Sequence, residues 1–196
     1  MDDEYDDALI EALETVRPVR GYWTGGADRA LAERGNAKMV LEAAGHQVGV
    51  LRSRVDGEDP PDCEGLVDGQ WCGIEVTELV DRETLKASMK NLRQHPDGSG
   101  GMYLNWTKEQ LVGALQDRIQ RKDKVPNGGP YKRYFLIIVT DEFMLTSDVV
   151  GAYLEAAVFR AELITDVIFG LSYEPSPTPS DCPGSNPIFR LPLAAP

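Results

Sequence analysis

The apolar run YFLIIVT, residues 134–140, restricts the fold of this chain more than any other stretch. It is short, nearly continuous and rich in β-branched side chains, which is typical of a central β-strand covered on both faces. The run therefore predicts a sheet with helices packed on either side. At 196 residues, 42% of them hydrophobic, the chain is long enough for one such domain, and we predict a single domain over residues 1–196.

The segments around this run alternate between helical and extended patterns. Strong helical patterns are expected at residues 27–45, 107–122 and 147–163, with Gly45 ending the first and Ser147 or Asp148 capping the last. Weaker helical patterns lie at 5–16 and 81–94, an irregular stretch at 95–101 and a Pro/Ser-rich loop at 174–187. Strands are expected at 46–55, 60–79 (as a hairpin), 164–173 and, at a sheet edge, 188–193. This order predicts an α/β fold with an αβββαβ core, a mixed β-sheet flanked by helices.

The hairpin carries acids on strands that should be buried. A two-residue turn at Asp68-Gly69 predicts the pairs Val67 with Gln70, Gly65 with Cys72, and Cys63 with Ile74. The same register makes Asp62 and Glu75 direct neighbours across the strands, where like charges are destabilising. A bound cation would remove this conflict, and two close carboxylates suit Mg²⁺ or Mn²⁺. Asp62 and Glu75 are therefore the candidate metal ligands, although each also fits a structural or solvated acid.

These residues resemble a known family. Pro61-Asp62 before the hairpin and Glu75-Val76-Thr77 on its second strand are similar to the signature of the PD-(D/E)XK nuclease superfamily, over the elements from about residue 27 to 140. The resemblance implies a restriction-endonuclease-like fold and Mg²⁺-dependent phosphodiester hydrolysis, with DNA as the expected substrate. It also implies that the two acids hold the metal while a lysine positions or activates the attacking water. Thr77 stands where that lysine should be, which puts the activity in doubt.

Lys122 is the candidate replacement for the missing lysine. The helix that contains it has its apolar stripe at Leu111, Leu115 and Ile119, with Arg118 beside them. At 3.6 residues per turn, Lys122 returns to within about 20° of the centre of this stripe, so it is predicted to point toward the sheet and the face of Glu75. The alternative is a lysine in the last helical turn that favours the helix dipole and extends into water.

Glu33 lies on the same stripe of the first strong helix as Ala37 and Ala44, so it is predicted to face the sheet. The resemblance implies that an acid from this helix can join the metal site. A salt-bridged or rim glutamate is the alternative interpretation. Glu64 and Glu78 are expected to be solvated or to support the site.

The net charge of −12 argues against nucleic acid, because phosphate binding depends on Lys and Arg. Seven acids precede the first base, Arg17, so much of this charge belongs to an acidic N-terminal helical segment, residues 1–20. Residues 108–133 contain seven bases against three acids, which indicates either a phosphate-facing patch or a solvated helix face of mixed charge. The acidic segment could bind a basic protein partner or block the cleft.

Further patterns exclude some classes of protein. No run of about 18 apolar residues and no signal-peptide pattern is present, which predicts a cytoplasmic protein without a membrane partner. The three cysteines form no CxxC pair, so structural zinc and a disulfide scaffold are not expected. Two functions remain, a Mg²⁺-dependent nuclease and a catalytically inactive nuclease-fold protein that acts as a binding module. Homodimerisation stays open in both cases.

Overall fold

The structure, a computed structural model, describes residues 26–54, 57–80, 105–142, 144–172 and 187–194. Its elements are α3 (Gly26–Ala43), β1 (Val48–Ser53), β2 (Cys63–Val67), β3 (Gln70–Glu78), α5 (Lys108–Lys122), β4 (Arg133–Thr140), α6 (Ser147–Leu154), β5 (Asp166–Leu171) and β6 (Ile188–Leu191). The helical patterns at 5–16 and 81–94, the stretch at 95–101 and all but the last residue of the Pro/Ser-rich loop lie outside the described residues.

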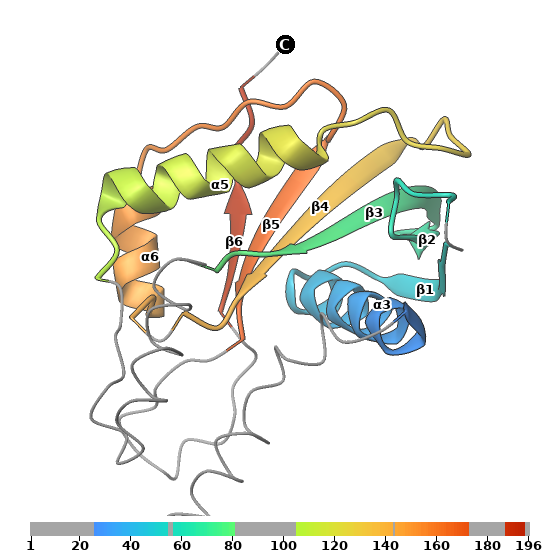
Figure 1. The fold of residues 1–196 in the computed structure, drawn as a ribbon, viewed down its shortest axis with the longest axis horizontal. Helices are drawn as coiled ribbons and strands as arrows, with labels where there is room; N and C mark the ends of the chain where they lie inside the picture. Colours follow the sequence, from blue (N-terminus) through green and yellow to red (C-terminus); the bar gives the residue numbers. More distant parts are fainter. Residues whose placement is uncertain (1–25, 55–56, 81–104, 143, 173–186, 195–196) are drawn as a thin grey trace, which may run out of the picture.

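The six strands form one mixed sheet in the order β1-β2-β3-β4-β5-β6 (Figure 1). Strand β2 runs antiparallel to both β1 and β3, while β3, β4 and β5 are parallel, and β6 closes the far edge antiparallel to β5. The parallel step from β3 to β4 needs a crossover connection, and α5 lies within it. The predicted α/β fold, a mixed sheet flanked by helices, is therefore confirmed, and so is the edge strand near the C-terminal end.

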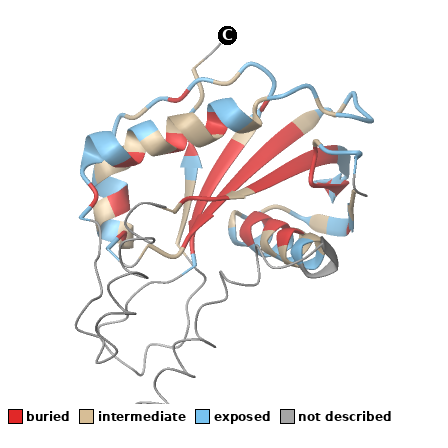
Figure 2. Ribbon diagram, viewed as in Figure 1, coloured by how far each residue is buried: buried red, intermediate tan, exposed pale blue. Residues whose placement is uncertain are grey.

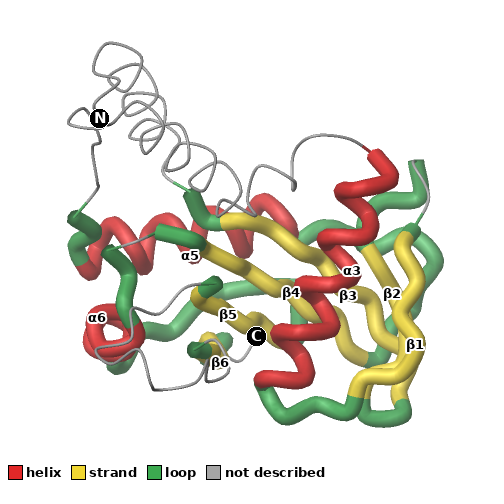
Figure 3. The backbone as a smooth tube through the Cα atoms, turned by 90° about the horizontal axis from the view of Figure 1, so that it is seen from below, coloured by secondary structure: helices red, strands yellow, loops and turns green. Residues whose placement is uncertain are grey.

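Alternating side chains of the central strands divide the core into two layers. In β4, Phe135, Ile137 and Val139 pack toward α3, whereas Tyr134, Leu136 and Ile138 pack toward α5 and α6. Figure 3 shows α3 lying across one face of the sheet and α5 behind the other, and Figure 2 shows that the central strands are buried. This two-sided covering is what the continuous apolar run at residues 134–140 predicts.

Helix α5 is fixed at both ends by side chains. Thr107 caps its first turn in a reciprocal capping box with Gln110. At the other end, Asp123 is the C-cap residue, and its carboxylate accepts hydrogen bonds from the backbone N–H groups of residues 162, 163 and 164, just before β5. The last helical residue, Lys122, is therefore held at a defined place above the sheet.

Helix α6 is shorter than predicted. Its N-cap is Thr146, whose side chain accepts the N–H of Val149, so the prediction of Ser147 or Asp148 as the cap is wrong. The helix ends at Leu154 instead of continuing to residue 163, because the chain turns at Ala156, which has a φ of +60°. Beyond this turn Phe159 is buried and forms an isolated β-bridge with Leu193. The apolar pattern there therefore belongs to a contact with the C-terminal segment and not to a longer helix.

None of the helices in the described part of the chain is long and apolar enough to cross a membrane.

Candidate functional site

The hairpin has the predicted register. Val67 pairs with Gln70 and Cys63 with Ile74, and the turn residues Asp68 and Gly69 have φ values of +53° and +73°. Two consecutive positive φ angles are what a tight two-residue hairpin turn requires, and Asp-Gly tolerates them. This turn sets the positions of the acids farther along both strands.

Asp62 and Glu75 come together at the open end of the hairpin. Asp62 immediately precedes β2, and its Oδ2 accepts a hydrogen bond from the backbone N–H of Val76, 2.8 Å away. This hydrogen bond gives the Val76 N–H a partner at a point on β3 where backbone pairing with β2 has already ended. Both acids are buried, with 6% of Asp62 and 1% of Glu75 exposed. Two carboxylates withdrawn from water need positive charge nearby.

Lys122 supplies that charge. From the last turn of α5 its Nζ donates hydrogen bonds to Asp62 Oδ2, at 3.1 Å, and to Glu75 Oε2. Only 26% of the side chain is exposed, so the lysine points toward the sheet, as its helical spacing predicts, and does not extend into water. One ammonium thus joins an acid on β3 and an acid just before β2 to the helix that lies between β3 and β4.

Sequence reasoning did not identify Tyr134, which also contacts this site. Its hydroxyl donates a hydrogen bond to Glu75 Oε1 over 3.2 Å, so the two oxygens of Glu75 bind Tyr134 and Lys122 separately. Tyr134 pairs with Gly73 in the parallel register between β3 and β4. It therefore lies on the α5 side of the sheet beside Glu75, where it restrains the orientation of the carboxylate.

Burial and like charge dominate the electrostatics of the site. Burial, with repulsion from Asp62, raises the pKa of Glu75 from 4.5 to about 7 despite the contact with Lys122. For Lys122, burial lowers the pKa, but attraction by Asp62 and Glu75 outweighs it and the pKa is raised above its ordinary value. The lysine therefore stays protonated at neutral pH, whereas Glu75 changes its charge there.

This shift predicts a pH-dependent stability for the metal-free protein. Folded Glu75 binds its proton more tightly than the unfolded chain does, so the penalty for ionising it is absent below about pH 4.5, grows as the pH rises to about 7 and levels off above that. Glu75→Gln cannot ionise, so we expect it to become more stable relative to wild type as the pH rises. Urea unfolding between about pH 5 and 8 measures this, and a stability difference that stays constant over that range would contradict it.

Glu33 faces the sheet as predicted and is buried. Its Oε1 accepts a hydrogen bond from Arg29 Nε at 2.7 Å, one helical turn earlier on α3. Arg29 Nη2 lies 4.0 Å from Asp62 Oδ1, on the oxygen that Lys122 does not contact. Glu33 thus reaches the site through an arginine that sequence reasoning did not identify, and its role in catalysis stays a prediction.

Glu64 and Glu78 are both buried, so the solvated alternative is wrong for both and the supporting alternative remains. Glu64 follows Asp62 by two residues on β2 and accepts hydrogen bonds from Arg52, Arg54 and Tyr131. Tyr131 can reach it because its ring packs against Gly73, where a side chain would collide with the ring. This buried ion-pair cluster supports the sheet next to Asp62.

The bases between residues 108 and 133 mostly neutralise acids of the same chain. Four of the seven lie in ion pairs: Arg118 and Arg121 with Asp117, Lys122 with Asp62 and Glu75, and Arg133 with Asp68 and Asp166. Lys124 and Lys132 are exposed. This pairing favours the mixed-charge interpretation over a phosphate-facing patch.

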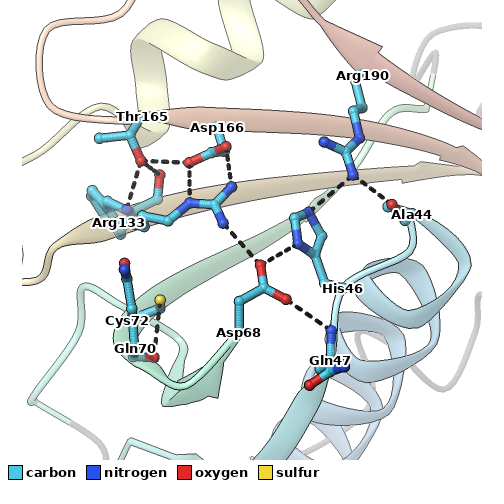
Figure 4. Close-up of polar contacts among 11 residues, drawn as sticks. Ala44, His46, Gln47, Asp68, Gln70, Cys72, Arg133, Thr165, Asp166 and Arg190 are labelled. Carbon is cyan, nitrogen blue, oxygen red and sulfur yellow. Dashed lines mark hydrogen bonds and ion pairs between the residues drawn. The ribbon is translucent and has the colours of Figure 1, made fainter.

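A second polar cluster lies at the turn of the hairpin (Figure 4). His46 stands between Asp68, 2.7 Å from Nδ1, and Arg190, 3.3 Å from Nε2. Because a guanidinium only donates, Nε2 accepts and the proton lies on Nδ1, directed at Asp68. Both ring nitrogens are thus occupied, and Arg133 joins Asp68 to Asp166 in the same network. The cluster ties α3, the hairpin turn and β4 to β6 together, and its geometry indicates a structural role.

Comparison with known proteins gave no match to a family model, to a curated protein or to a solved structure.

Proposed function

We propose that the chain is a Mg²⁺- or Mn²⁺-dependent nuclease that hydrolyses phosphodiester bonds, with DNA as the expected substrate. One observation carries the proposal: the Lys122 ammonium contacts both Asp62 and Glu75. Two acids and a lysine therefore meet, although Thr77 occupies the lysine position of the superfamily pattern.

The arrangement of elements also supports a restriction-endonuclease-like fold. Helix α3 precedes three antiparallel strands, and α5 then leads to β4, which is parallel to β3. This is the αβββαβ order implied by the resemblance, with the acids on the hairpin of the second and third strands. Fold alone does not decide chemistry, so the function is inferred from the side chains of the site.

The donor set fits a small divalent cation. Within the described residues no group of three or more His, Cys, Asp and Glu side chains is placed to hold a metal, so the proposed ion would have only the Asp62 and Glu75 carboxylates as protein ligands there. Mg²⁺ commonly uses one or two protein carboxylates and leaves its other positions to water and phosphate oxygens. When all groups are ionised, the site has three negative charges, from Asp62, Glu75 and Glu33. Two positive charges, from Lys122 and Arg29, leave a net charge of −1, which favours binding of a cation. When bound, such an ion polarises a phosphate and acidifies water.

The chain's own residues have separate tasks in this proposal. Hydrolysis adds a water oxygen to phosphorus and breaks one P–O ester bond, while the attacking water releases a proton to solvent and the leaving oxygen takes one up. Lys122, protonated at neutral pH, places positive charge where the phosphate gains negative charge and is the candidate proton donor. Tyr134 holds one oxygen of Glu75, which keeps the other directed toward Lys122. In Asp62 the Val76 N–H binds Oδ2, the same oxygen that Lys122 contacts, and so fixes that oxygen in place.

The second candidate is a catalytically inactive nuclease-fold protein that binds a partner. Thr77 at the lysine position and the net charge of −12 favour it. The pairing of the bases between residues 108 and 133 adds to this, because few of them are available for phosphates. In this case the acidic segment at residues 1–20 would bind a basic partner.

A substrate and metal panel separates the two candidates. The purified chain would be incubated with supercoiled plasmid, linear duplex, single-stranded DNA and RNA, each with Mg²⁺, Mn²⁺ or EDTA. The nuclease proposal expects cleavage of at least one substrate with a divalent ion and none in EDTA. Binding without cleavage under all conditions would favour the inactive module instead.

A further inference from the structure

Arg29 and Glu33 form a pair beside the site that the proposed chemistry does not yet use. We propose that Arg29 binds a phosphate of the nucleic-acid substrate next to Asp62, and that Glu33 is the residue that positions Arg29. This inference rests on the proposed function, because it names a further substrate contact of the same site. It also assigns Glu33 to the arginine and not to the metal.

The geometry of Arg29 suits an anion. Glu33 binds its Nε at 2.7 Å, which fixes the guanidinium from one side. Nη2 is 4.0 Å from Asp62 Oδ1, too far for a hydrogen bond, and 44% of the side chain is exposed. The guanidinium is thus fixed through Nε beside the site, in a side chain of which nearly half is exposed. A planar guanidinium with accessible Nη donors matches phosphate oxygens well.

The position relative to Lys122 supports a shared phosphate. Lys122 contacts Oδ2 of Asp62, whereas Arg29 approaches Oδ1, so two cations flank one carboxylate. They come from α5 and α3, which cover opposite faces of the sheet. A phosphate that approaches Asp62 would therefore meet positive charge from both sides.

Glu33 differs from an ordinary helix-surface glutamate. Only 8% of its side chain is exposed, and its contact within the described residues is to Arg29. Helix α3 contains a second ion pair with the same four-residue spacing, Lys38 with Glu42, whose side chains are 58% and 50% exposed and 3.9 Å apart. Exposed pairs of this kind contribute little, which makes Lys38 and Glu42 matched controls.

Oligonucleotide binding in EDTA tests the inference without requiring cleavage. Fluorescence anisotropy with a labelled single-stranded and a labelled duplex oligonucleotide would be recorded against salt for wild type, Arg29→Gln, Glu33→Met and the double variant. We expect each single change to weaken binding on the order of ten-fold and the double variant to bind no worse than Arg29→Gln alone. The slope of log affinity against log salt should fall by about 0.7 to 0.9, the loss of one phosphate contact.

The controls separate positioning from metal binding. Glu42→Met and Lys38→Gln should leave affinity and salt slope unchanged. A divalent ion held by Asp62 and Glu75 should raise the Tm of the folded protein. Glu33→Met should keep this Mn²⁺-induced rise, because a positioning residue does not hold the metal. Loss of that rise would make Glu33 a metal ligand and overturn the assignment.

The binding assay itself has two outcomes that would also overturn the proposal. One is wild-type affinity and salt slope in Arg29→Gln. The other is a wild-type protein that binds neither oligonucleotide. Arginine-dependent binding without any cleavage would refute the nuclease and leave the phosphate contact standing.

Discussion

Lys122→Met is expected to reduce cleavage by a factor of about 100 to 10,000, the range typical for loss of a positioned proton donor or acceptor. The change keeps the unbranched stem of the side chain and removes the ammonium that joins Asp62 to Glu75. Single-turnover cleavage with saturating protein measures the chemical step directly. Lys124→Met is the control, because Lys124 is exposed two residues later and should stay fully active.

The same variant should also lose stability without metal. From helical spacing alone, Lys122→Met would be expected to leave Tm nearly unchanged. The contacts with two buried carboxylates alter that expectation. Removing one partner of a buried ion pair lowers the free energy of unfolding by about 3–5 kcal/mol. Protonation of Glu75 offsets part of this loss. Mg²⁺ should then raise the Tm of Lys122→Met more than that of wild type. Wild-type cleavage by Lys122→Met would refute the lysine's role.

Asp62→Asn and Glu75→Gln are expected to abolish both divalent-ion binding and cleavage. Each variant keeps the shape of the side chain but removes one of the two negative charges that would hold the ion. Both proteins should stay folded, because an amide avoids the cost of a buried charge and the amide oxygen in Asp62→Asn can still accept the Val76 N–H. Calorimetric titration with Mn²⁺ measures the binding.

Glu109→Gln is the matched control for this titration, since Glu109 is an exposed acid in the first turn of α5. Wild-type Mn²⁺ binding by both Asp62→Asn and Glu75→Gln would remove the proposed metal site, even if the protein cleaves nucleic acid by other means.

The sequence contained enough information to place the central acids and the lysine. The Asp68-Gly69 turn determines the hairpin register, and period-two alternation then gives the face of Glu75. The stripe of α5 gives the direction of Lys122, because a helix that packs on a sheet must present its apolar side. These are local patterns, and local patterns are readable from one sequence.

Contacts that depend on tertiary register could not be read in the same way. Tyr134 reaches Glu75 only because β4 pairs with β3 in one particular parallel register, which is set by the crossover and by packing. No local pattern in the sequence brings Arg29 near Asp62, since the distance between them depends on how α3 crosses the sheet. The early end of α6 has a similar cause, because Phe159 pairs with Leu193, far away in the chain. The burial of Glu64 follows from its arginine and tyrosine partners, which lie 10 to 67 residues away in sequence.

Plasmid cleavage by wild type and Glu75→Gln, purified side by side by the same procedure, tests the proposed nuclease site. We expect wild type to nick or linearise the plasmid in Mg²⁺ or Mn²⁺ and EDTA to stop the reaction. Glu75→Gln should be inactive while its circular dichroism spectrum matches wild type. Equal cleavage by both proteins would contradict the account, because the activity would then come from another site or from a contaminant.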